Sequence, residues 1–183
     1  MLTGFKYIGE TIDKSEDGNY VFGMEESYGY LVGKHARDKD AISAIMIIAE
    51  MFAYYKKSGK TLISALNGLY EKFGYFTTSL YNKTFDGKDG MEYMRSFTAK
   101  LRSKPWEEIA GEKVLSVTDY SLGVDGLPKS DVMTFKGERF SLTVRPSGTE
   151  PKLKTYLTAV DKTAAGSETL LSKLKVFAEN AIV

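Results

Sequence analysis

The sequence predicts an α/β segment followed by an α+β domain, in a chain of 183 residues. In the first half, one strand-like run leads into a polar loop and two helical patterns. In the second half, several strand-like runs are grouped between two helices, as expected for helices packed on a mainly antiparallel sheet. With 43% hydrophobic residues, the chain can form buried cores, and its length allows one or two domains.

Charge and composition exclude several classes of function. The formal net charge of +1 provides no broad basic field, so we expect no nucleic-acid partner and no anionic membrane surface as partner. The chain has no cysteine, no secretory signal and no apolar run long enough to span a bilayer, and these features favour the cytoplasm. Any anion must therefore bind at a local site.

Helical patterns dominate the first half. The apolar spacing of residues 5–12 predicts a short helix. Asp40 is expected to cap a helix over residues 41–55, and Thr61 a second helix over residues 62–73. The apolar stripe of the longer helix comprises Ile42, Ile45, Met46, Ala49 and Phe52. The composition of the preceding residues 20–24, aromatic and β-branched, favours a buried strand.

A run of turn-forming residues, DGKDG at residues 86–90, follows the extended-looking stretch 75–85. We expect the domain boundary there, which gives a first domain of residues 1–85 and a second of residues 86–183.

The second domain is expected to be α+β. Apolar spacing predicts a helix over residues 91–101, and Ser167 is the candidate cap of a final helix. Strand-like runs occupy residues 113–120, 131–136, 139–144 and 152–160.

The segment RPSGTEPKLK, residues 145–154, has the composition of a phosphate-binding loop. Arg145 offers a planar fork for two phosphate oxygens, and Ser147 and Thr149 offer hydroxyl donors. Gly148 leaves the backbone N–H groups accessible to an anion. An ordinary turn explains Pro, Ser and Gly equally well, so the residues alone leave both interpretations open.

The segment GMEESYGY, residues 23–30, follows a predicted strand and carries adjacent carboxylates. In an extended chain, Glu25 and Ser27 point to the same side and Glu26 points away, so the first two are the better candidates for contacts with sugar hydroxyls. A solvated acidic loop is the alternative. Two carboxylates without further ligands make a weak metal site.

The segment HARDKD places His35, Arg37 and Lys39 at alternate positions before a helix start, where a phosphorylated ligand is favoured. Alternatively, Arg37 and Lys39 pair with Asp38 or Asp40. For His35 we favour a structural role, and for Lys39 both interpretations stay open.

Taken together, GMEESYGY, RDKD and RPSGTEPKLKTY resemble the α-D-phosphohexomutase superfamily on its phosphoglucomutase side. The match extends from TGFKYIGE at residues 3–10 through DGKDGME to the phosphate loop. The resemblance implies that residues 1–85 form an N-terminally incomplete third domain of α/β character. Residues 86–183 then form a complete α+β fourth domain.

The resemblance also assigns roles to individual residues. It implies that Glu25 and Ser27 contact sugar hydroxyls and that Lys39 lies near the sugar. The residues implied to hold the phosphate that is not transferred are Arg145, Ser147, Gly148, Thr149 and Lys154. Several branches of the superfamily have a His after ESG, where this chain reads ESYGY, and this departure favours a glucose-type branch.

In the superfamily, the active-site phosphoserine and the Mg²⁺ ion belong to the first two domains. This chain has no TASHNP-type serine loop and no DxDxD loop, so we expect no catalytic residue and no metal ligand in it. The implied parent enzyme is an isomerase that interconverts hexose 1-phosphate and hexose 6-phosphate, and its N-terminal domains are the expected partner. We expect this chain alone to be inactive. A non-catalytic phosphosugar-binding module and part of a pentose-phosphate mutase are the alternatives.

Overall fold

The computed structural model describes residues 4–15, 19–25, 28–124 and 126–182. The chain divides into two compact units, residues 1–68 and 69–183. Each unit contains its own cluster of buried hydrophobic side chains.

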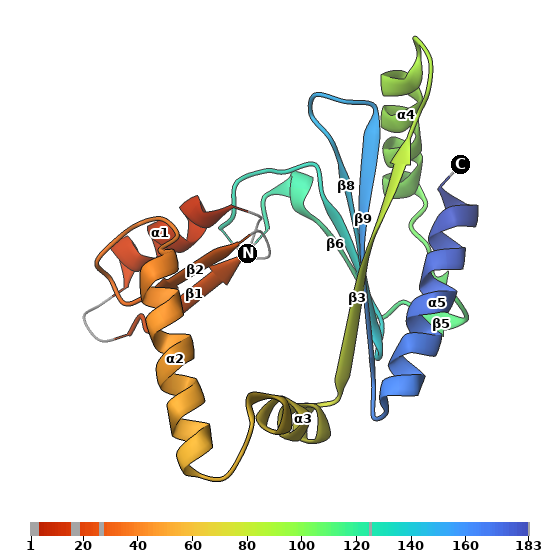
Figure 1. Cartoon of the computed structure of the whole chain (residues 1–183). Helices are drawn as coiled ribbons and strands as arrows, with labels where there is room; N and C mark the ends of the chain where they lie inside the picture. Colours follow the sequence, from red (N-terminus) through yellow and green to blue (C-terminus); the bar gives the residue numbers. More distant parts are fainter. Residues whose placement is uncertain (1–3, 16–18, 26–27, 125, 183) are drawn as a thin grey trace. The chain divides into compact units, whose positions relative to one another are not determined.

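The first unit is built on a small antiparallel hairpin. Its elements are α1 (Phe5–Lys14), β1 (Phe22–Glu25), β2 (Gly29–Val32), α2 (Ala41–Lys57) and the start of α3 (Leu62–Phe73). Strands β1 and β2 pair from Phe22 opposite Val32 to Glu25 opposite Gly29. Helix α1 lies beside this hairpin in Figure 1, and its apolar spacing brings Phe5, Ile8 and Ile12 into one buried cluster with Leu31.

Both helix caps predicted in this half are confirmed. The Asp40 carboxylate accepts hydrogen bonds from the N–H groups of Ile42 at 3.0 Å and Ser43 at 3.4 Å. The Thr61 hydroxyl accepts one from the N–H of Ser64 at 3.0 Å. These contacts satisfy backbone donors that have no partner inside the helix, which is why the two helices begin where they do.

The apolar stripe predicted for α2 is exposed in the described structure. Ala44 is the one buried residue of this helix among those described, whereas Ile42 and Ile45 are 69% and 63% exposed. The strand predicted at residues 20–24 forms as β1, but it is not buried as expected, since Val21 beside it is 71% exposed and Met24 within it 57%. A two-stranded hairpin is too small to cover a helix that is apolar on most sides.

The second unit is an α+β domain, in which helices pack on an antiparallel sheet. Together with the α/β character of the first unit, it confirms the predicted fold class. Its sheet has five strands in the order β3-β9-β8-β7-β6, and β4 and β5 form a separate two-stranded sheet. In chain order the elements are β3 (Tyr75–Thr84), α4 (Gly90–Ser103), β4 (Glu108–Ile109), β5 (Glu112–Lys113), β6 (Ser116–Asp119), the 3₁₀ helix η1 (Tyr120–Leu122), β7 (Met133–Lys136), β8 (Phe140–Pro146), β9 (Lys152–Asp161) and α5 (Ala164–Ala181).

Strand β3 belongs to this sheet, although it was expected to close the first domain. It pairs with β9 along its whole length, from Tyr75 opposite Asp161 to Thr84 opposite Lys152. The compact units accordingly divide after Gly68, whereas the expected domain boundary lies after residue 85. Local composition correctly indicates an extended strand here, but its partner is distant in the sequence.

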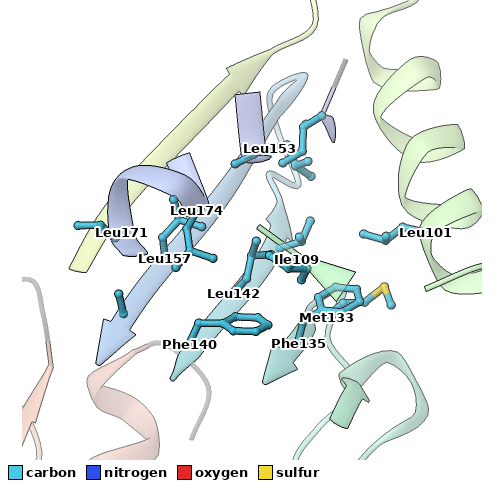
Figure 2. Packing of buried hydrophobic residues seen from close by; sticks show 14 of the residues in the cluster. Leu101, Ile109, Met133, Phe135, Phe140, Leu142, Leu153, Leu157, Leu171 and Leu174 are labelled. Atoms are coloured by element: carbon cyan, nitrogen blue, oxygen red, sulfur yellow. The ribbon is translucent and has the colours of Figure 1, made fainter. Parts of the chain in front are cut away.

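Alternation along β8 and β9 builds the core. Phe140, Leu142 and Val144 of β8 are buried, and so are Leu153 and Leu157 of β9. They belong to one buried cluster with residues of α4 and α5, and Figure 2 shows Leu157 of β9 beside Leu171 and Leu174 of α5. The opposite side of the two strands therefore carries their remaining, more polar residues.

The final helix begins earlier than predicted. Thr163, not Ser167, is its cap, and the Thr163 hydroxyl accepts the N–H of Gly166 at 3.0 Å. Ser167 is fully buried, with its hydroxyl 2.7 Å from that of Thr77. The prediction was wrong because the first helical turn, Ala-Ala-Gly, carries no apolar period to reveal it.

One buried hydroxyl generates a stability prediction. Thr155 is fully buried on the core face of β9, and its Oγ1 has no hydrogen-bond partner among the described residues. Because Val keeps the shape and removes the polar atom, we predict that Thr155→Val leaves the free energy of unfolding unchanged or raises it by about 1 kcal/mol. Denaturant unfolding monitored by circular dichroism measures the change.

Thr134→Val is the matched control. The Thr134 side chain is also buried, but its hydroxyl lies 2.9 Å from the Thr143 hydroxyl, so its loss should lower the free energy of unfolding by about 1 kcal/mol. A loss in Thr155→Val as large as in Thr134→Val would contradict the prediction.

Candidate functional site

The predicted phosphate loop lies at the tip of the β8–β9 hairpin, drawn in light blue in Figure 1. Arg145 pairs with Lys154, and Pro146 pairs with Leu153. Residues directly opposite in an antiparallel pair point to the same side of the sheet. Because Val144 and Leu153 point into the core, Arg145 and Lys154 lie together on the other face.

The pairing continues one step into the loop. The N–H of Ser147 donates to the carbonyl of Lys152 at 2.8 Å, which places the Ser147 and Lys152 side chains on the face of Arg145 and Lys154. Lys152 was not among the predicted site residues. The alternation of the two lysines in KLK is the signal from which it could have been found.

The loop itself is organised by the Ser147 hydroxyl. Its oxygen accepts the N–H groups of Glu150 at 3.3 Å and Thr149 at 3.5 Å. Gly148 is exposed, does not have a positive φ, and a Cβ built on it would meet nothing within 4 Å. Neither packing nor backbone conformation requires a glycine here, so its open backbone is available to a ligand.

Arg145 differs from Arg102 and Arg139 of the same unit in its ion pairing. Arg102 pairs with Asp119 and Asp131, and Arg139 pairs with Glu112 and Asp161. Those two guanidiniums stabilise the fold and are electrostatically satisfied. No ion pair among the described residues involves Arg145, which is half-buried. Its charge is therefore available to an external anion.

The second candidate site lies at the end of the β1–β2 hairpin. Glu25 is the last residue of β1, with 16% of its side chain exposed, and its Oε1 lies 3.2 Å from Nζ of Lys39. The same ammonium lies 3.3 Å from Asp38 and 5.6 Å from the centre of the Phe5 ring. The hydrogen bond with Glu25, followed by that with Asp38, raises the pKa of Lys39.

The structure thus brings Glu25 and Lys39 together, two of the three residues predicted near the sugar. The third, Ser27, and its neighbour Glu26 lie outside the described residues, so the predicted division between inward and outward carboxylates stays a prediction. Tyr28 follows with a positive φ of 52° and a side chain that is 97% exposed.

His35 and Arg37 contact the fold. Nε2 of His35 lies 2.8 Å from the capping carboxylate of Asp40, and Arg37 pairs with Asp13 at 2.5 Å. Lys39 does pair with Asp38, but the contact with Asp13 was not among the pairings expected for Arg37. The expectation of a structural role for His35 agrees with this geometry.

Within the described ranges, no group of three or more His, Cys, Asp or Glu side chains is arranged to hold a metal ion. Over the same ranges, none of the helices combines the length and apolar character needed to cross a membrane.

Two family models match the chain. Residues 1–73 match the α/β/α domain III of phosphoglucomutase/phosphomannomutase, and residues 121–168 match the C-terminal domain of the same family. The order of the two matches agrees with the order of the two hairpins.

Curated relatives include the phosphoglucomutases of Staphylococcus aureus strain bovine RF122 / ET3-1 and Staphylococcus haemolyticus strain JCSC1435. They are 37% and 36% identical over alignments 169 positions long, which cover 86% of this chain and 31% of each relative. The chain thus spans about a third of their length. The crystal structure of pp63/parafusin, a phosphoglucomutase from Paramecium in its open form, superimposes with a TM-score of 0.71 at 22% identity and shows the same fold over 98% of this chain and 33% of that one.

The two matches fall on domain III and on the C-terminal domain of one family, in that order along the chain. The chain belongs to the phosphoglucomutase/phosphomannomutase family, and it corresponds to domains III and IV of that family.

The cap of α2 generates a pH prediction. Hydrogen bonds, first with His35 and then with the N–H of Ile42, lower the pKa of Asp40 below its ordinary value of 3.8. A carboxyl with a depressed folded-state pKa stabilises the fold above its unfolded-state pKa, and this stabilisation is lost as the pH falls through the folded-state pKa. We predict that Asp40→Asn lowers the melting temperature near neutral pH and that its difference from the parent disappears as the pH falls well below 3.8.

Melting curves at several pH values measure the difference. Asp86→Asn, at an exposed position outside the helices and strands, is the matched charge control. A difference between Asp40→Asn and the parent that persists unchanged at the lowest pH would contradict the role of the charge.

Proposed function

We propose that this chain is the substrate-recognition part of a phosphoglucomutase-type isomerase, and that the β8–β9 loop holds the phosphate that is not transferred. The observation that carries the proposal is the shared face of Arg145, Ser147, Lys152 and Lys154, opposite the core. Arg145 supplies a fork, the lysines supply charge and Ser147 a hydroxyl, which together suit a phosphate dianion. Gly148 and Thr149 complete the loop through backbone and hydroxyl donors.

The β1–β2 hairpin is proposed to hold the sugar. The Lys39 ammonium donates a hydrogen bond to Oε1 of Glu25, and no described residue donates one to Oε2. That oxygen is free to accept a hydrogen bond from a sugar hydroxyl. Ser27, two residues after Glu25 in the sequence, is proposed to contact the sugar as well.

The whole enzyme is proposed to interconvert hexose 1-phosphate and hexose 6-phosphate through a bisphosphate. A phosphoserine outside this chain gives its phosphoryl group to the free hydroxyl of the sugar phosphate, and after reorientation the other phosphate returns to the serine. A phosphate loop that accepts either phosphate and a hairpin that contacts hydroxyls suit a ligand that binds in two orientations. The serine, and Mg²⁺ in the parent enzyme, belong to other domains.

The partner of this chain is then the rest of the same enzyme. The relatives are about three times as long, and the matched family domain is described as α/β/α, whereas the first unit contains a two-stranded sheet. We propose that the exposed apolar residues of α2, such as Ile42 and Ile45, pack against strands from the remaining polypeptide.

Phosphate binding is the first test. Because the proposed donors lie in one unit, the isolated chain should bind inorganic phosphate with about millimolar affinity. Arg145→Ala should weaken binding at least about tenfold, and Arg145→Lys should be intermediate because it keeps the charge and loses the fork. Amide chemical shifts followed during a phosphate titration measure both affinity and location.

Gly148→Ala sharpens this test. A methyl group there meets no atom of the chain within 4 Å, so the free energy of unfolding should not fall, while phosphate binding should weaken. Parent-like binding by Arg145→Ala, or largest shifts outside residues 145–154, would contradict the phosphate-loop assignment.

Catalysis is the second test. The purified chain should not convert glucose 1-phosphate in the presence of Mg²⁺, because covalent phosphoryl transfer needs a nucleophile from other domains. The full-length gene product should convert it. Turnover by the chain alone, after host mutase is excluded, would contradict the proposal. Tight phosphosugar binding by a full-length product without turnover would favour the non-catalytic module instead.

A further inference from the structure

Gly29 has no conformational reason to be glycine. It is buried, it lies in β2 opposite Glu25, and it is not among the residues with a positive φ. Any residue type can adopt its backbone conformation, so the reason for a glycine must lie in what occupies the space beside its Cα.

That space is filled by the Glu25 and Lys39 side chains. A Cβ built on Gly29 would lie 2.3 Å from Cγ and 3.1 Å from Cδ of Glu25, and 3.1 Å from Cδ of Lys39. Directly opposite residues normally keep their Cβ atoms about 4.5–5.5 Å apart, with side chains side by side. Here the Glu25 side chain instead bends across Gly29 to reach the Lys39 ammonium at 3.2 Å.

Two other glycines of the first unit differ in this respect. A Cβ on Gly23 would lie 2.4 Å from the Tyr20 hydroxyl and 2.7 Å from Cγ2 of Ile8, so this glycine serves the packing of α1 on the hairpin. A Cβ on Gly68 would meet nothing within 4 Å. Gly29 is the glycine of these three that makes room for the candidate sugar-binding residues.

We infer that Gly29 is a positioning residue: its missing side chain is the space through which Glu25 reaches Lys39, and it thereby fixes the direction of the carboxylate oxygen offered to a ligand hydroxyl. The ligand part of this inference rests on the proposed function. With Oε1 held by Lys39, Oε2 is presented in one orientation to a polyhydroxylated ligand. A methyl group at residue 29 displaces Cγ of Glu25 and breaks the ion pair.

The first experiment needs no ligand. Titration of the Lys39 ¹³Cε resonance measures the pKa of its ammonium group, which faces Glu25, Asp38 and the Phe5 ring. In the parent this pKa should lie above 10.5, and Glu25→Gln and Gly29→Ala should both shift it downward. Gly23→Ala, a packing control, and Gly68→Ala, a neutral one, should leave it raised. A Lys39 pKa in Gly29→Ala as high as in the parent would overturn the inference.

The second experiment tests whether Gly29→Ala destabilises the fold through its contact with Glu25. If the added methyl collides with Cγ of Glu25, its effect should depend on that side chain. Gly29→Ala should lower the melting temperature of the parent, and in a Glu25→Ala background the same substitution should cause a much smaller loss. Equal losses in both backgrounds would show that another contact explains the glycine, and the inference would fail.

The third experiment separates this inference from the proposed function. In the full-length enzyme, Glu25→Gln and Gly29→Ala should each lower kcat/KM about tenfold or more, and the double variant should be no worse than the poorer single one. Gly68→Ala should match the parent. An unchanged kcat/KM in Glu25→Gln would refute the sugar role of Glu25, whereas the Lys39 titration would still decide the positioning role of Gly29.

Discussion

The antiparallel register of β8 and β9 is the constraint on which both the core and the phosphate loop depend. With Arg145 opposite Lys154, the alternate residues Val144 and Leu153 are directed into the core. A shift of one strand by a single residue would point Leu153 to the other face and bring Lys154 to the core side. Burial of an unpaired cation costs far more than burial of an apolar side chain contributes, so the register that forms the core also places the cations. The buried core and the face proposed to bind phosphate are therefore both set by the same two-residue alternation.

Strand β9 connects this hairpin to the rest of the sheet in the second unit. It pairs with β8 on one side and, along its entire length, with β3 on the other. Helix α5 is held to the outer strand by the buried hydrogen bond between Thr77 and Ser167. The hairpin that carries the proposed phosphate loop is thus anchored by a neighbouring strand and a helix, and Gly148 and Thr149 lie exposed in the loop at its end. The strand residues just before them, by contrast, are not exposed.

How much of this could be predicted depends on the distance over which each feature is determined. The Asp40 and Thr61 caps were predictable because a side chain and the N–H it binds lie within three residues. The place of β3 in the sheet, the contact between Arg37 and Asp13, and the burial of Ser167 depend on segments far away in the sequence, and local patterns gave no signal for them. The α2 stripe was predicted correctly as apolar, but whether it is covered depends on more sheet than the first unit contains.

The candidate site residues also divide into those that nearby residues determine and those that depend on distant segments. The residues proposed to bind phosphate could be named as a group from the sequence because they lie close together in it, and the strand register adds Lys152 to them. The contact between Glu25 and Lys39 joins a strand end to a loop fourteen residues away, and sequence reasoning could assign the two residues to one ligand but not to each other. The role of Gly29 depends on that contact, so it becomes visible only once the side chains are placed.

The two candidate sites differ in their charge. In a chain of net charge +1, Arg102 and Arg139 are each neutralised locally by two carboxylates. At the β1–β2 hairpin the cation is neutralised as well, and the pair of Lys39 with Glu25 leaves a carboxylate oxygen suited to a neutral hydroxyl. At the β8–β9 loop the cations are left without such partners among the described residues, which suits a doubly charged anion. A ligand that carries hydroxyls at one end and a phosphate at the other matches this division of charge, and it does so without any general attraction for anions.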